Sequence, residues 1–111
     1  MLSFLTQSPS PEQKKLAAWS KCSPAAGLLG AMGFRQDDFG NILAFDQFGK
    51  RSEYGWEIDH IHPVALGGSD APGNLRALHW RSNRSLGGLL GNEMKAGNAL
   101  AQAIRARNAL K

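Results

Sequence analysis

The chain has 111 residues, a length that suits one small domain. Its 13 Lys and Arg residues outnumber its 9 Asp and Glu residues, and the net charge of +4 permits nucleic-acid binding without requiring it. The single cysteine, Cys22, excludes an internal disulfide and a structural zinc site built from CxxC pairs. No apolar run is long enough to span a bilayer, and no signal peptide is recognisable. We therefore expect a cytoplasmic protein with no membrane partner, although export by a signal-independent system would leave no trace of this kind.

The N-terminal part is expected to begin with a flexible tail over residues 1–9, followed by one domain over residues 10–111. A helix is predicted from Ser10 to about Lys21, because Ser10 can cap it and Gln13 completes a capping box. The side chains expected to face the core are Leu16, Ala17 and Trp19 or Cys22. Residues 24–33 are predicted to form a packed loop or a short helix.

Three strands are predicted in the middle of the chain. The first covers residues 42–46 and is expected to pair with a second at about residues 54–60, because turn residues flank the first. Pro63 ends the second strand, since proline has no N–H group to donate to a neighbouring strand. A loop rich in Gly and Pro follows, and residues 75–79 alternate enough to form a third short strand.

Two helices are predicted near the C-terminus. Ser82 is expected to cap a short helix over residues 83–86 that Gly87-Gly88 ends. A last helix is predicted from Asn92 or Glu93 to about Ala109. Its expected apolar stripe consists of Leu100, Ala103, Ile104 and Leu110.

Residues able to carry chemistry are concentrated in three short runs: Asp59-His60-Ile61-His62-Pro63, Asn74-Leu75-Arg76 and Arg81-Ser82-Asn83-Arg84. A hard divalent cation needs oxygen ligands such as a carboxylate or an amide carbonyl. A neutral imidazole can take a proton from water near pH 7. The arginines on either side of Asn83 suit a polyanionic substrate. These groups are the minimum set for metal-assisted cleavage of a phosphodiester.

The order of these residues resembles the HNH endonucleases, whose core is the ββα-metal motif that the colicin DNases also use. The matching residues are Asp59-His60-Ile61-His62-Pro63, Gly67-Gly68-Ser69-Asp70, Asn74-Leu75 and Asn83-Arg84. They span about residues 54–86. The resemblance implies an α+β fold, in which one small domain has a ββα-metal (HNH) core with flanking helices.

The resemblance also implies a role for each matched residue. Asp59 would be the first metal ligand, and His60 would be the general base that directs a water at the phosphorus. Asn74 would tie the loop and position the histidine. Asn83 would bind the metal through its amide oxygen, in the place where other members carry the last His of the family name. Because this His is replaced, one Mg²⁺ or Mn²⁺ ion is favoured over Zn²⁺. Leu86 stands where members often carry Lys, which removes one expected phosphate contact.

The remaining residues of this region have open or structural interpretations. His62 is expected to be a structural loop residue rather than a second base. For His79 a structural role and a phosphate-orienting role both stay open. Glu57 is interpreted as a solvated strand residue, and Trp56 as a packing residue.

The expected function is a metal-dependent endonuclease that hydrolyses DNA, with Arg76, Arg81 and Arg84 as phosphate anchors. Two alternatives remain. The chain could be a nuclease toxin neutralised by an immunity protein, or a non-catalytic nucleic-acid-binding or assembly module with a degenerate HNH site. A DNA-processing complex is a further possible partner. The presence of Asp59, His60 and Asn83 together argues against the degenerate site. The sequence leaves open the cleavage specificity and the choice between DNA and RNA.

Overall fold

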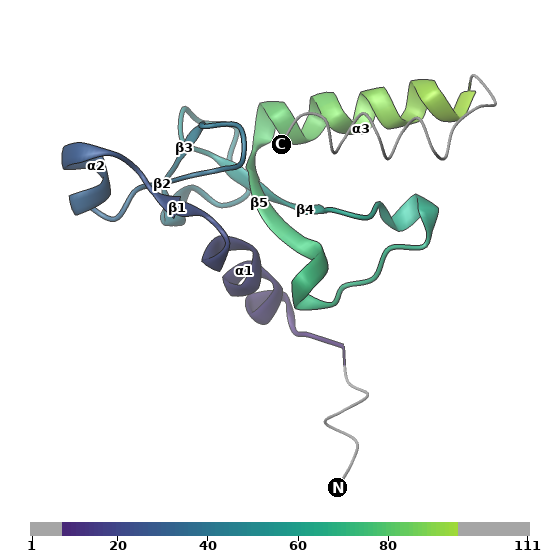
Figure 1. Ribbon diagram of the computed structural model, residues 1–111, viewed down its shortest axis with the longest axis horizontal. Helices are drawn as coiled ribbons and strands as arrows, with labels where there is room; N and C mark the ends of the chain where they lie inside the picture. The colour runs from purple at the N-terminus through teal and green to yellow at the C-terminus, as the bar shows by residue number, and fades with distance from the viewer. Residues whose placement is uncertain (1–7, 96–111) are drawn as a thin grey trace, which may run out of the picture.

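The computed structural model describes residues 8–95. In chain order the helices and strands are α1 (Pro11–Ser20), β1 (Ser23–Pro24), α2 (Gly27–Ala31), β2 (Arg35–Gln36), β3 (Ile42–Leu43), β4 (Trp56–His60), β5 (Leu75–His79) and α3 (Trp80–Lys95) (Figure 1). Short 3₁₀ helices lie at Phe45–Gln47, Val64–Leu66 and Pro72–Asn74. One antiparallel sheet has the order β1-β2-β3, and β4 and β5 form the second. The expected α+β class is confirmed. Residues 1–7 of the predicted tail, and residues 96–111 of the predicted last helix, lie outside the described residues.

Helix α1 begins as predicted. Ser10 Oγ accepts from the Gln13 N–H at 3.1 Å, and Gln13 Oε1 accepts from the Ser10 N–H at 2.8 Å, which completes the capping box. The prediction that Leu16 packs inward is wrong, since its side chain is 49 % exposed. The face turned to the core carries Trp19, as expected, together with Ala18, and both are buried.

The main hydrophobic core lies between α1 and the sheet formed by β4 and β5. Its centre is Trp56, whose ring centroid lies 5.2 Å from that of Trp19. The Trp56 indole N–H donates to the Ala44 carbonyl at 3.0 Å, so burial of this side chain leaves its polar atom satisfied. Leu75 and Ala77 complete the core from β5. This packing fixes one face of the two-stranded sheet and leaves the other face to α3.

The predicted pairing of residues 42–46 with residues 54–60 is wrong. β4 pairs with β5, in the register Trp56↔His79 to His60↔Leu75. β3 covers Ile42–Leu43 only and pairs with β2. After β3 the chain turns into a 3₁₀ helix and contacts the segment before β4 through an N–H of Ala44 that donates to the Tyr54 carbonyl. All five residues of β5 are buried, so the third predicted strand, found at Leu75–His79 as expected, is the one that completes β4.

Helix α3 is longer than predicted at both ends. It begins at Trp80, directly after β5, and continues through Gly87 and Gly88 to Lys95. Glycine inside a helix costs only about 1 kcal/mol relative to alanine, an amount that packing can offset. Leu86, which is 2 % exposed, provides such packing. The Ser82 hydroxyl does not cap a helix; it accepts from Asn41 Nδ2 at 3.1 Å.

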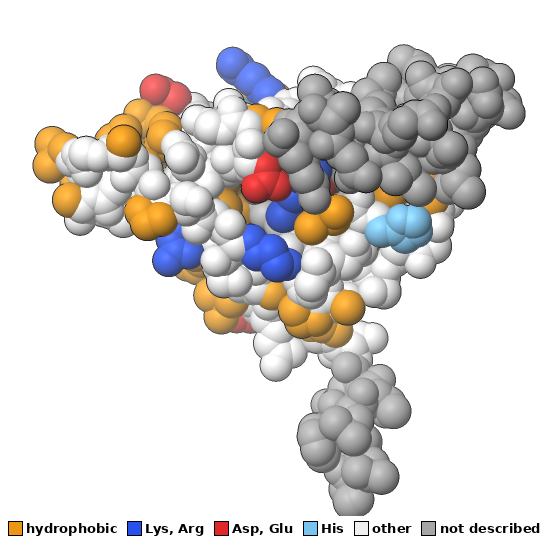
Figure 2. Space-filling view, in the orientation of Figure 1, with side chains coloured by type: hydrophobic (Ala, Val, Ile, Leu, Met, Phe, Trp, Pro, Cys, Tyr) orange, Lys and Arg blue, Asp and Glu red, His pale blue; other side chains and the backbone are white. Residues whose placement is uncertain are grey.

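Helix α2 confirms the short-helix alternative for residues 24–33, and it stands apart from the core. Leu28 is 76 % exposed and Met32 is 63 % exposed, and hydrophobic side chains gather on the surface at the α2 end of the molecule (Figure 2). None of the residues of α2 is buried. The chemistry-bearing residues therefore lie at the other end, on the unit formed by β4, β5 and α3. No helix within residues 8–95 is both long enough and apolar enough to cross a membrane.

Candidate active site

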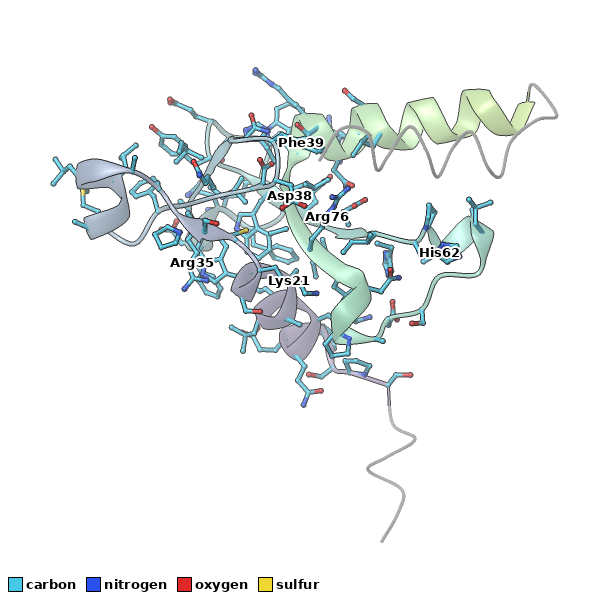
Figure 3. The ribbon with its side chains drawn as sticks, viewed as in Figure 1. Lys21, Arg35, Asp38, Phe39, His62 and Arg76 are labelled. Carbon is cyan, nitrogen blue, oxygen red and sulfur yellow. The ribbon has the colours of Figure 1, made fainter. Side chains whose placement is uncertain are left out.

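Asp59 is held by a cross-strand ion pair. In the β4–β5 register Asp59 lies directly opposite Arg76, and neighbours of this kind project from the same face of a sheet. Arg76 Nε donates to Asp59 Oδ2 at 2.9 Å, and Arg76 Nη1 donates to Asp38 Oδ2 at 2.9 Å (Figure 3). Asp59 is 5 % exposed and Arg76 is 3 % exposed. The carboxylate is therefore fixed in position by a buried guanidinium.

The burial of Arg76 argues against the phosphate contact expected from the sequence. A guanidinium that is 3 % exposed and bonded to two carboxylates cannot reach a phosphate in solution without leaving them. A basic residue close in sequence to a predicted site need not face the substrate, and Arg76 faces two carboxylates. The structure makes Arg76 a counter-ion of Asp59.

The loop between β4 and β5, residues 61–74, is closed by one side chain. Asn74 Oδ1 accepts from the His62 N–H at 2.7 Å, and Asn74 Nδ2 donates to the carbonyls of His62 and Ser69 at 3.1 and 2.8 Å. These contacts hold the loop against the end of β4, where His60 lies. The structure thus places Asn74 across the loop, where its contacts hold the segment that follows His60.

The two glycines of the loop have separate reasons to be glycine. Gly67 has a φ of 94°, a left-handed conformation that side chains with a Cβ rarely adopt. A Cβ on Gly68 would lie 1.7 Å from the His62 carbonyl oxygen, so a residue with a Cβ could not bring its backbone this close to His62. The pair lets the loop fold back on the segment that follows His60.

His60 contacts a carboxylate from this loop. Its Nε2 lies 2.7 Å from Asp70 Oδ1. Asp70 also accepts from Lys14 Nζ of α1 at 3.4 Å. The hydrogen bond from His60, and then the charge of Lys14, hold the pKa of the Asp70 carboxyl below its usual value. Asp70 was matched to the family pattern from the sequence, but nothing in its spacing indicated that it would contact His60.

Asn83 lies on the first turns of α3 and is oriented by Glu57 of β4. Glu57 Oε1 accepts from Asn83 Nδ2 at 3.0 Å, and its Oε2 accepts from Arg84 Nη2 at 3.0 Å. A carboxylate only accepts hydrogen bonds, so the nitrogen of the Asn83 amide must be the atom that faces Glu57. The amide oxygen is then the atom that Asn83 can offer to a bound ligand. Glu57 is therefore more than the solvated strand residue that the sequence indicated.

A pocket of about 290 Å³ brings the expected metal ligands and the expected base together. Asp59, His60 and Asn83 all line it, although Asn83 comes from a different element. The other lining residues are Ile58, Pro63, Val64, Ala65 and Gly87. One carboxylate, one imidazole and one amide thus meet at a single hollow with an apolar surround.

The donor set of this pocket fits a hard divalent cation. Among the described residues, no group of three or more His, Cys, Asp or Glu side chains is placed to hold a metal. The pocket offers one carboxylate and one amide oxygen, and an ion such as Mg²⁺ usually keeps several waters and takes few protein ligands. The orientation that Glu57 imposes on Asn83 supports this fit, because it directs the amide nitrogen away from a cation.

His62 and His79 both have structural contacts. His62 is exposed on the loop, where its Nε2 lies 3.0 Å from the Leu66 carbonyl. His79 is 9 % exposed; its Nε2 lies 2.8 Å from the Glu53 carbonyl, and its Nδ1 accepts from the Arg81 N–H at 3.2 Å. For His79 the structure favours the structural interpretation over a phosphate-orienting one.

The sheet, the loop and the helix together form a ββα unit with a pocket between strand and helix, an arrangement typical of small metal-dependent nucleases. Residues 46–88 match the family model described as HNH endonuclease. The chain therefore carries an HNH endonuclease domain, and the matched segment includes all of β4, β5 and the pocket residues. Comparisons with curated proteins and with solved structures gave no significant match. The family indicates a nuclease-type function.

Proposed function

We propose that this protein is a divalent-metal-dependent endonuclease that hydrolyses phosphodiester bonds of DNA. The observation that carries the proposal is the meeting of Asp59, His60 and Asn83 at one pocket of the HNH domain. The three residues supply oxygen ligands for a hard cation and a nitrogen base within one site. Mg²⁺ or Mn²⁺ is the ion that this set of oxygen donors favours.

Each residue has a defined task in this proposal. Asp59 and Asn83 would hold the cation, which when bound neutralises charge that develops on the phosphate and on the leaving oxygen. His60 takes a proton from a water molecule, and that water forms a bond to phosphorus as the bond to the 3′ oxygen breaks. The leaving 3′ oxygen takes a proton from a second water molecule of the solvent. The products then carry a 5′-phosphate and a 3′-hydroxyl, as in the family.

Metal removal tests the proposal most directly. We expect excess EDTA to abolish nicking of supercoiled plasmid, and added Mg²⁺ or Mn²⁺ to restore it. The reason is that the proposed reaction needs the cation to neutralise charge on the phosphate and on the leaving oxygen. Gel electrophoresis of the plasmid forms measures the rates. Undiminished cleavage in EDTA would contradict the metal mechanism. Absence of cleavage with every divalent ion would instead favour a non-catalytic DNA-binding module.

The exposed arginines of α3 are the proposed phosphate anchors. Arg81 is exposed and its guanidinium lies 5.1 Å from the centre of the Trp80 ring, while Arg84 is half exposed and bonded to Glu57. Both therefore stand on the surface of the helix that also supplies Asn83. A phosphate bound there would lie close to the pocket.

Replacing both Arg81 and Arg84 with alanine is expected to weaken binding to all DNA sequences alike. The slope of log K against log salt should become shallower by about 0.9 for each lost phosphate contact. Fluorescence anisotropy with a labelled duplex at several salt concentrations measures the slope. Arg51→Ala is a matched control, because Arg51 is exposed but does not lie on α3. An unchanged slope in the double variant would assign both arginines a structural role.

A further inference from the structure

The contact between His60 and Asp70 extends the site beyond the residues already assigned. The distance of 2.7 Å from His60 Nε2 to Asp70 Oδ1 is short for a hydrogen bond between nitrogen and oxygen, which is typical of a bond to an ionised partner. The His60 side chain is 27 % exposed and that of Asp70 is 42 % exposed, so solvent reaches the pair without separating it.

We infer that Asp70 is a positioning residue for the proposed base His60, fixing both the rotation of its imidazole ring and its tautomer. A carboxylate at Nε2 favours the tautomer in which Nε2 carries the proton, because only that form can donate to Asp70. Nδ1 is then the nitrogen with the basic lone pair. This inference rests on the proposed function, since it assigns to Asp70 the orientation of that function's base.

The ionisation of Asp70 supports the same assignment. The pKa of its carboxyl is lowered by the hydrogen bond from His60 and by the charge of Lys14. The lowered pKa favours the ionised carboxylate, the form that accepts a hydrogen bond from Nε2.

The surrounding structure holds Asp70 in place from two sides. On one side, Asn74 Nδ2 donates to the carbonyl of Ser69, the residue next to Asp70, at 2.8 Å. On the other side, α1 contributes Lys14, which donates to Asp70 Oδ2, and Lys21, whose ammonium donates to the carbonyls of Pro72 and Leu75. The Lys14 pair is long and partly exposed, so it contributes little by itself. The closed loop is the main support, and α1 braces it from outside the segment that matches the family.

The state of the His60 ring can be measured without any cleavage assay. In protein labelled with ¹⁵N at histidine, the two ring nitrogens of a fixed neutral tautomer have widely separated chemical shifts, whereas exchange between tautomers averages them. In the native protein above pH 8 we expect His60 to show the Nε2-protonated form. In Asp70→Ala we expect the two shifts of His60 to move toward each other. His79 is an internal control, because its two nitrogens are engaged by Glu53 and Arg81, far along the chain from Asp70.

Two substitutions at the same position separate orientation from mere packing. Asp70→Asn keeps an oxygen that can accept from Nε2, so it should preserve the tautomer and most of kcat. Asp70→Ala should lower kcat for nicking by about 10–100-fold, the usual effect of losing a side chain that orients a functional histidine. KM for DNA and the calorimetric affinity for Mn²⁺ should stay unchanged in both variants. Asp46→Ala, which removes an exposed carboxylate of the same domain, should change none of these quantities.

The outcomes distinguish this inference from the proposed function. An unaltered tautomer and kcat in Asp70→Ala, or an Asp70→Asn variant as impaired as Asp70→Ala, would overturn the positioning role. If the native protein cleaves no DNA with any divalent ion, the proposed function fails, and the tautomer of His60 alone then decides whether Asp70 orients the ring.

Discussion

Replacing His60 with alanine is expected to lower the rate of plasmid nicking by about 10²–10⁴-fold, the usual contribution of a general base. The substitution removes the proton acceptor and leaves Asp59 and Asn83 in the pocket. Calorimetric titration of Mn²⁺ should therefore still show binding. His62→Ala is the matched control, since His62 is exposed on the neighbouring loop, where its ring contacts the Leu66 carbonyl.

The comparison with Asp59→Ala distinguishes the loss of the proposed general base, His60, from the loss of a proposed metal ligand, Asp59. Among the described residues that line the pocket, Asp59 is the only anionic one, so its loss should weaken metal binding itself. Added Mg²⁺ should then recover part of the activity of Asp59→Ala and none of the activity lost in His60→Ala. If His60→Ala loses metal as severely as Asp59→Ala, His60 is a ligand and the assignment of the base is wrong.

The parts of the fold that could be predicted are those determined by local chemistry. The capping box of Ser10 and Gln13 fixes the start of α1 whatever the rest of the chain does. The run Leu75–His79 forms a strand because its residues suit a sheet that is covered on both faces. In both cases the signal used for the prediction lies within a few consecutive residues, although β5 also pairs with the distant β4.

The parts that were predicted wrongly depend on partners distant in the chain. Residues 54–60 could pair with the strand before or after them, and the burial of Trp56 against α1 does not select between the two. Likewise, the two glycines at 87 and 88 would end an isolated helix, but α3 packs on β4 and β5 and continues through them. Leu16 is hydrophobic and was therefore expected in the core. The sheet instead packs against the face of α1 that carries Ala18 and Trp19.

The candidate site likewise contains residues that could be predicted from the sequence and contacts that could not. Asp59, His60 and Asn83 could be picked out because their residue types and order have a chemical meaning, and the structure brings all three to one pocket. The orienting roles of Arg76, Glu57 and Asp70 were not predicted, because these residues act through contacts that only the folded chain creates. The sequence did contain one indication of the role of Glu57. Glu57 and Asp59 are two residues apart on one strand, so their side chains lie on the same face of the sheet, the one toward α3.

The buried pair of Asp59 and Arg76 leads to the largest expected effect on stability. In Arg76→Met the Asp59 carboxylate, which is 5 % exposed, loses its cation, whereas Asp38 has a side chain that is 43 % exposed and can be hydrated. Breaking a buried pair by removing one partner typically lowers the free energy of unfolding by about 3–5 kcal/mol. Small domains are stable by about 5–15 kcal/mol in total, so much of the stability should be lost. Urea denaturation in EDTA measures the change without any contribution from bound metal.

A double-mutant cycle shows whether the loss comes from removing the Arg76 cation beside the Asp59 carboxylate. In Asp59→Leu with Arg76→Met both charges are absent, and apolar replacements of a buried pair are often neutral or stabilising. The double variant also removes Arg76 Nη2, a buried nitrogen for which the described part of the chain offers no hydrogen-bond partner. It should therefore be more stable than either single variant, although it should no longer bind metal. Arg84→Met is the control: this arginine is half exposed and paired with Glu57 at a similar distance, and its replacement should cost no more than about 1 kcal/mol. Additive losses in the cycle would show that Arg76 stabilises the fold through packing rather than as the counter-ion that holds Asp59 in the pocket.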